Sequence, residues 1–217
     1  MFRADPPDGD DFDEQREKMV DALVGAGRLD DETVIEALKA VPRHEFVPEA
    51  RRDRAYIDRP LPIGSDQTVS APHIVGIMSE LLELEDGDEV LEIGTGCGYH
   101  AAVTAEIVGD ENVYSVEYLD ELAEDARETL SELGYDIEIR VGDGHEGWSE
   151  HAPYDAAYLT CAAAEIPEGI VDQLRGGGIF VGPIGTAEQR LIKATKTETG
   201  LDREDHGGVR FVRMQGD

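Results

Sequence analysis

The sequence has few cysteines and no long hydrophobic run, and each shortage excludes a class of protein. The two cysteines among 217 residues, Cys97 and Cys161, are too few for a disulfide framework. No apolar run approaches the roughly 18 residues that a membrane helix needs. Residues 1–13 are too acidic for a signal peptide. We therefore expect a cytoplasmic protein without a membrane segment.

Basic residues are also scarce. Lysine and arginine together number 19 against 49 aspartates and glutamates, which gives a formal net charge of −30. A field of this sign repels phosphate backbones and anionic membrane surfaces, so we expect neither nucleic acid nor a membrane as a partner. Such a surface suits very high salt, where the Debye length falls to about 3 Å. We expect a halophilic source; an unusually acidic mesophilic protein is the alternative.

Aromatic residues make up only 6% of the chain, which together with high charge is compatible with disorder. The regular pattern after residue 85 argues against disorder. There, short apolar segments alternate with helical ones, which predicts an α/β fold with a doubly wound parallel sheet. Helices are expected at 99–108, 119–133 and 167–174. Parallel strands are expected at 89–93, 112–117, 137–141, 154–160 and 178–183, followed by an antiparallel pair at 190–197 and 209–213.

The residues before 85 lack this alternation. Helices are expected over 12–26, from about Asp30–Asp31 to Pro42, and from Pro72 to about 84. The segment 42–70 has no clear period, and long irregular segments in compact domains are commonly functional. We expect one structural unit with three regions: a disordered tail at 1–11, an N-terminal helical extension that covers the site at 12–84, and the core at 85–217.

A glycine-rich loop follows the first strand of the core. Gly94, Gly96 and Gly98 let the backbone turn sharply and let a ligand approach it, and the following helix offers free N–H groups. Glu117 closes the next strand, where a carboxylate can bind both hydroxyls of a ribose. The combination predicts a nucleotide-type ligand; a tight turn that binds nothing is the alternative.

Two features favour S-adenosylmethionine over a dinucleotide. The dinucleotide pattern needs a third small residue where this chain has Tyr99. Glu92, two residues before the loop, is expected to place a negative charge beside it, which disfavours a pyrophosphate and favours an amino group. Tyr99 therefore argues against a dinucleotide, and Glu92 favours a cationic ligand of the S-adenosylmethionine type.

Further candidates follow the later strands. Asp143 and Gly144 come after the third strand, where the carboxylate can accept a hydrogen bond from an adenine amine; an ordinary Asp-Gly turn is the alternative. Cys97 and Cys161 also follow strands, and we expect them to border the crevice as packing residues rather than redox groups. The histidines have no metal-ligand spacing and no paired-cysteine motif exists, so no metal is expected.

Longer motifs carry a resemblance to a known family. The segments VPRHEFVP (41–48), PLPIG (60–64), QTVSAPH (67–73), AAAEIP (162–167) and HGGV (206–209) resemble, in this order, the protein-L-isoaspartate O-methyltransferase family. Other methyltransferases share the glycine loop but lack the 67–73 block. The resemblance implies a Rossmann-like methyltransferase sheet with an N-terminal helical extension.

The resemblance also implies an activity and its residues. The enzyme would transfer a methyl group from S-adenosylmethionine to the free α-carboxylate of L-isoaspartyl residues in damaged proteins and peptides, leaving S-adenosylhomocysteine. The ester then closes to a succinimide, whose hydrolysis returns some aspartate. Ser70 would orient the substrate carboxylate, with a helix N-cap as its alternative role. Gln67, Thr68 and Val69 would close over the cofactor, and residues 209–212 would lie beside the substrate.

Two departures from the family pattern concern the substrate. Asp66 adds a negative charge where an anionic substrate is expected, and Arg213 replaces a proline. We expect Arg213, Arg210 or Arg59 to offset Asp66 by pairing with the substrate carboxylate. A methyltransferase for another carboxylate or a small molecule, and a non-catalytic cofactor-binding protein, remain alternatives. We expect a monomer.

Overall fold

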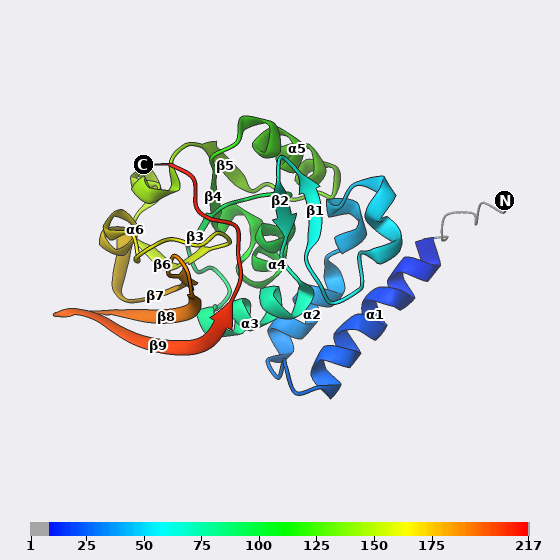
Figure 1. Cartoon of the computed structure of the whole chain (residues 1–217), viewed down its shortest axis with the longest axis horizontal. Coiled ribbons are helices and arrows are strands. Elements are labelled where there is room, and N and C mark those ends of the chain that lie inside the picture. The colour runs from blue at the N-terminus through cyan, green and yellow to red at the C-terminus, as the bar shows by residue number, and fades with distance from the viewer. Residues whose placement is uncertain (1–8, 217) are drawn as a thin grey trace.

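The computed structural model describes residues 9–216, which form a seven-stranded sheet with helices packed around it (Figure 1). The strand order is β5-β4-β3-β6-β7-β8-β9. The first five strands in this order are parallel, whereas β8 is antiparallel to both β7 and β9. The bounds are β3 (Val90–Ile93), β4 (Val113–Glu117), β5 (Glu138–Val141), β6 (Tyr154–Leu159), β7 (Leu174–Ile184), β8 (Gln189–Thr197) and β9 (Gly200–Val209).

The alternation of strands and helices is confirmed. Helices α4 (Tyr99–Val108), α5 (Asp120–Glu132) and α6 (Glu168–Gln173) lie between the parallel strands in the sequence. Ile93 at the end of β3 is paired with Val116 of β4 and Leu159 of β6. The carboxyl ends of these three strands therefore meet at one edge, and this edge is where a doubly wound sheet binds its ligands. The expected Rossmann-like fold is the fold observed.

The expected strand at 209–213 is wrong. The partner of β8 is β9, whose residues 202–206 are all exposed and polar. An edge strand of this kind shows no hydrophobic alternation, whereas the two apolar residues after it resemble a strand. The sequence pattern therefore predicts the strand at those residues instead. After Val209 the backbone no longer pairs with β8. Instead, the Gln189 side chain forms hydrogen bonds with the backbone of Phe211, and the backbone of Ala162 forms them with Val212 and Met214.

The N-terminal region contains three α-helices, α1 (Gly9–Gly25), α2 (Glu32–Ala40) and α3 (Pro72–Leu82). Of the expected tail 1–11, residues 1–8 lie outside the described residues, and 9–11 already belong to α1. The N-cap of α2 is Asp31, whose Oδ1 accepts hydrogen bonds from the N–H groups of Thr33 and Val34. This start agrees with the sequence pattern.

The segment expected to be irregular contains short regular elements. Two 3₁₀ helices, η1 (Arg43–Phe46) and η2 (Glu49–Arg54), precede a hairpin of β1 (Leu61–Gly64) and β2 (Gln67–Val69). The hairpin turn needs positive φ at Ser65 (47°) and Asp66 (57°), which is the geometry of a tight two-residue turn. Neither residue is the glycine that usually marks such a turn, so no local signal predicts the hairpin.

The extension and the sheet share one hydrophobic core. A single buried cluster contains Val20, Leu38 and Met78 of the extension together with Val103 and Val181 of the sheet region. Gly76 allows the close packing of α3, because a Cβ there would lie 2.5 Å from Leu29 Cδ2. No helix between residues 9 and 216 is both long and apolar enough to cross a membrane.

Candidate active site

The glycine loop joins β3 to α4 at the ligand-binding edge. Gly94, Gly96 and Gly98 have φ values of 97°, 56° and 88°, a region that favours glycine. A Cβ at Gly94 would also collide with Oγ1 of Thr160. Gly94 and Gly96 line a pocket at the sheet edge, whereas Gly98 lies behind the loop against Leu130. The first two glycines are therefore placed for a ligand, and the third for packing.

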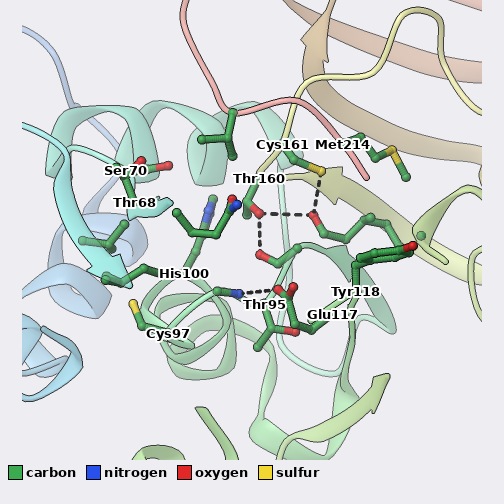
Figure 2. Close-up of a pocket in the computed structure, with 18 of the residues that line it drawn as sticks. Thr68, Ser70, Thr95, Cys97, His100, Glu117, Tyr118, Thr160, Cys161 and Met214 are labelled. Atoms are coloured by element: carbon green, nitrogen blue, oxygen red, sulfur yellow. Dashed lines mark hydrogen bonds between the residues drawn. The ribbon is translucent and has the colours of Figure 1, made fainter. Parts of the chain in front are cut away.

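Glu117 is fixed against this loop at the end of β4. Its Oε2 accepts the backbone N–H of Gly96 at 2.8 Å, and its Oε1 accepts that of Leu119 at 3.0 Å. The side chain is only 6% exposed, yet it lines the pocket (Figure 2). A carboxylate accepts about four hydrogen bonds, so both oxygens retain capacity for ribose hydroxyls. This arrangement supports the predicted role.

Two other segments complete the pocket. The hairpin contributes Ile63, Gln67, Thr68 and Val69, and Ser70 directly follows it. The segment after β9 contributes residues 212–215. Figure 2 shows Thr68, Ser70 and His100 on one side of the pocket, with Glu117 and Tyr118 across from them. Asp66 does not line this pocket, so its expected charge beside the substrate is not observed there.

Ser70 lies between β2 and α3. The N-cap of α3 is Ala71, which has no capping side chain, so the alternative role of Ser70 as the N-cap is wrong. Among the described residues, the Ser70 hydroxyl has no hydrogen-bond partner. A polar group that lines a pocket without a protein partner is available to a substrate.

Glu92 does not line the pocket. It is fully buried, where Ser115 Oγ donates to its Oε2 at 2.6 Å and the Tyr158 hydroxyl to its Oε1 at 3.0 Å. Burial raises the pKa of Glu92 to about 8, so the group is mostly protonated at neutral pH. The expected negative charge beside the loop is therefore absent. Glu92 supports the loop indirectly, because Ser115 Oγ also lies 2.6 Å from Thr95 Oγ1.

Asp143 and Gly144 differ in their position relative to the pocket. The Asp143 carboxylate accepts the backbone N–H of His145 at 2.9 Å and caps the short helix η4 (Gly144–Glu146). Gly144 lines the pocket, whereas Asp143 does not. Asp143 therefore caps a 3₁₀ helix, and Gly144 lines the pocket.

The pocket also contains titratable side chains that are neutral. His100, which was not expected at the site, is buried on α4 and lines the pocket; burial lowers its pKa to about 3. Its position two residues after Gly98 of the glycine loop was the signal in the sequence. Cys97 and Cys161 border the crevice as expected, and burial raises their pKa values to about 11 and 12. Protonated thiols fit the packing role.

The residues fit S-adenosylmethionine. The loop backbone and Glu117 offer a nucleoside site, and the pocket extends from there to Ser70. Within residues 9–216, no group of three or more histidine, cysteine or acidic side chains is placed to hold a metal ion.

Comparisons with known proteins agree with this site. Residues 14–217 match the family model of protein-L-isoaspartate(D-aspartate) O-methyltransferase. Protein-L-isoaspartate O-methyltransferase 2 of Archaeoglobus fulgidus is 52% identical over 210 residues, 95% of each chain. The enzyme of Methanopyrus kandleri is 48% identical over 211 residues, 95% of this chain and 93% of its own.

A solved structure shows the same fold. The protein-L-isoaspartate O-methyltransferase of Plasmodium falciparum, in complex with S-adenosylhomocysteine, superposes with a TM-score of 0.81 at 25% identity, covering 92% of this chain and 98% of the other. The pocket, the motifs and these relatives agree: the chain belongs to the protein-L-isoaspartate(D-aspartate) O-methyltransferase family.

Proposed function

We propose that this protein methylates the free α-carboxylate of L-isoaspartyl residues in damaged proteins and peptides, with S-adenosylmethionine as the methyl donor. The observation that carries the proposal is a pocket that combines the glycine loop, Glu117 and Ser70 in a chain that matches the family from residue 14 to 217. The methyl ester would then close to a succinimide and begin the repair of the backbone.

S-adenosylmethionine, when bound, supplies a methyl group that its sulfonium activates for transfer. The substrate carboxylate is already an anion at neutral pH, so no general base is required of the protein. Its residues need only bind, orient and exclude water. Glu117 would hold the ribose, and the backbone at Gly94, Gly96 and Gly144 would contact the rest of the nucleoside. Asp143 and Glu92 would support the site without touching the donor. Asp143 would do so by capping η4, and Glu92 by supporting the glycine loop.

The methyl acceptor would be oriented at the Ser70 end. The Ser70 hydroxyl has no partner among the described residues and can donate a hydrogen bond to the substrate carboxylate. Gln67, Thr68 and Val69 on β2 would close over the donor. The protonated thiols of Cys97 and Cys161 are weak nucleophiles, so these side chains do not compete for the methyl group.

The decisive experiment compares an isoaspartyl peptide with its aspartyl twin. Radiolabelled methyl donor should label the isoaspartyl peptide alone, with a base-labile ester. Label on another carboxylate or on a small molecule would identify a different methyltransferase. Calorimetric binding of S-adenosylhomocysteine without product on any acceptor would identify a non-catalytic homologue.

We further propose that the protein works as a monomer at high salt in the cytoplasm. A net charge of −30 repels an anionic substrate at long range, and molar salt screens this repulsion. Activity should therefore rise with salt. Equal activity at roughly 0.1 M and 2 M salt, with circular dichroism showing the same fold at both, would contradict the proposal.

A further inference from the structure

A second depression lies directly beside the donor pocket. We name it the arginine groove and define it by residues 186–190, 208–211 and 213. It lies between the turn that joins β7 to β8 and the segment that follows β9. Its charged side chains are Arg190, Arg210, Arg213 and Glu188.

Two of these arginines are available to an anion. Arg190 is held by Asp205, whose carboxylate oxygens lie 2.9 and 3.0 Å from its Nε. Arg210 and Arg213 are exposed, and neither forms an ion pair within the part of the chain that the structure describes. Within residues 9–216, the Arg213 side chain donates only to the carbonyl of Thr186, at 3.3 Å. With Glu188 opposing them, the groove keeps a small positive charge on a protein of net charge −30.

The groove is continuous with the donor pocket through Arg213, which lines both. An isoaspartyl residue in the pocket is part of a polypeptide, and that polypeptide must leave the pocket. The segment 212–215 also lines the pocket, so a chain that leaves the pocket past Arg213 enters the groove.

The backbone that carries these arginines is fixed. The Gln189 side chain accepts the N–H of Phe211 at 2.6 Å and donates to its carbonyl at 3.1 Å. Ala162 donates to the carbonyl of Val212 at 2.8 Å and accepts the N–H of Met214 at 2.9 Å. Both arginines therefore extend from positions set before a substrate binds, which lowers the ordering cost of recognition.

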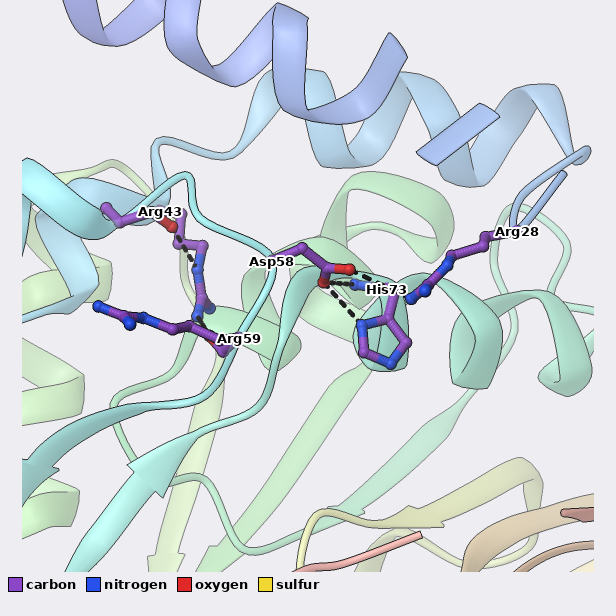
Figure 3. A network of polar contacts seen from close by, with 6 residues as sticks. Arg28, Arg43, Asp58, Arg59 and His73 are labelled. Atoms are coloured by element: carbon purple, nitrogen blue, oxygen red, sulfur yellow. Dashed lines mark hydrogen bonds and ion pairs between the residues drawn. The ribbon is translucent and has the colours of Figure 1, made fainter. Parts of the chain in front are cut away.

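Arg59, the third arginine expected to pair with the substrate carboxylate, lies elsewhere. Its carbonyl accepts a hydrogen bond from Arg43 Nη2 at 3.3 Å, beside the contacts of Asp58 (Figure 3). Among the described residues, Arg59 lines neither the donor pocket nor the arginine groove. It does not contribute to the same surface.

We propose that the arginine groove binds the polypeptide flank of the isoaspartyl substrate, and that Arg210 and Arg213 make the enzyme prefer acidic residues beside the damaged site. The inference rests on the proposed function. The chemistry is pairing of guanidinium with carboxylate at an exposed surface, which is moderate in strength and screened by salt.

The test uses two isoaspartyl peptides that differ only in their flanks, Asp and Glu in one and Asn and Gln in the other. We expect kcat/KM to be about fivefold higher for the acidic peptide at the lowest salt that keeps the protein folded, which is the size of one or two exposed ion pairs. The ratio should approach one in molar salt. The double variant Arg210→Gln/Arg213→Gln should bring it to about one at low salt.

Arg203→Gln is the matched control, because Arg203 is exposed on β9, forms no ion pair among the described residues and lines neither depression. It removes one positive charge where the double variant removes two, at a place outside the groove, and should keep the wild-type ratio. A ratio of one in the wild type, or an unchanged ratio in the double variant, overturns the inference while isoaspartyl methylation itself stands. Methylation of neither peptide overturns the proposed function and the groove's role with it.

Discussion

The carboxylate of Asp58 contacts His73 at two atoms: Oδ1 accepts the backbone N–H at 3.0 Å and lies 2.6 Å from the ring Nδ1 (Figure 3). Helix α3 begins at Pro72, which has no N–H, so His73 carries the first donor that needs a partner. A residue from the segment before the hairpin therefore caps the helix that follows Ser70. This contact holds the first turn of α3, two residues after Ser70, from outside the pocket.

We expect Asp58→Ala to lower the free energy of unfolding by about 1 kcal/mol, the usual effect of losing an N-cap. It should also reduce kcat/KM, because the start of α3 supports Ser70. Chemical denaturation and steady-state kinetics measure the two effects. His73→Ala keeps the backbone N–H and is the control; an equal loss of stability in both variants would assign the effect to the ring contact instead.

Glu117→Ala should weaken the binding of S-adenosylhomocysteine about 10- to 100-fold, since hydrogen bonds to a charged group contribute about 1.5–3 kcal/mol each. Isothermal titration calorimetry gives the dissociation constant directly. Glu121→Ala removes an exposed carboxylate from the first turn of α5 and should leave the constant unchanged. Unchanged affinity in Glu117→Ala would contradict the proposal that Glu117 binds the ribose.

Ser70→Ala should lower kcat about tenfold through the loss of one hydrogen bond to a carboxylate. Stability and donor affinity should stay near wild type, because the hydroxyl caps no helix and has no partner among the described residues. Thermal unfolding, calorimetry and kinetics together separate these effects. By contrast, Ser79→Ala should destabilise the protein, since this buried hydroxyl donates to the Val75 carbonyl at 3.0 Å. A similar fall in the melting temperature of Ser70→Ala would point to a structural role.

The buried Glu92 predicts a pH dependence of stability. Its pKa is about 8 in the folded protein against 4.5 for the free side chain, so the folded state retains a proton that the unfolded state loses. Its stabilisation is complete below about pH 4.5 and decreases as the pH rises through 8, by on the order of a few kcal/mol. Glu92→Gln should remove this dependence. Free energies of unfolding between pH 5 and 9 test it, and parallel curves for the two proteins would contradict it.

The parallel part of the fold could be predicted because its signals are local. Helix α4 occupies Tyr99–Val108 as expected, and each parallel strand lies within a few residues of its predicted range. The hairpin and β9 could not be predicted in this way. The turn of the hairpin has no glycine, and β9 is a polar edge strand that β8 specifies through backbone hydrogen bonds rather than through side-chain pattern.

The sequence by itself determined the order of the parallel strands and the helices between them, the glycine loop and the position of Glu117, because hydrophobic period and backbone freedom depend on neighbouring residues. Only the tertiary structure decided the rest. In the folded chain Glu92 is buried away from the pocket, the Ser70 hydroxyl does not cap α3, and Arg213 lines both the donor pocket and the arginine groove. Burial and long-range contacts are properties of the packed chain, so no local pattern encodes them.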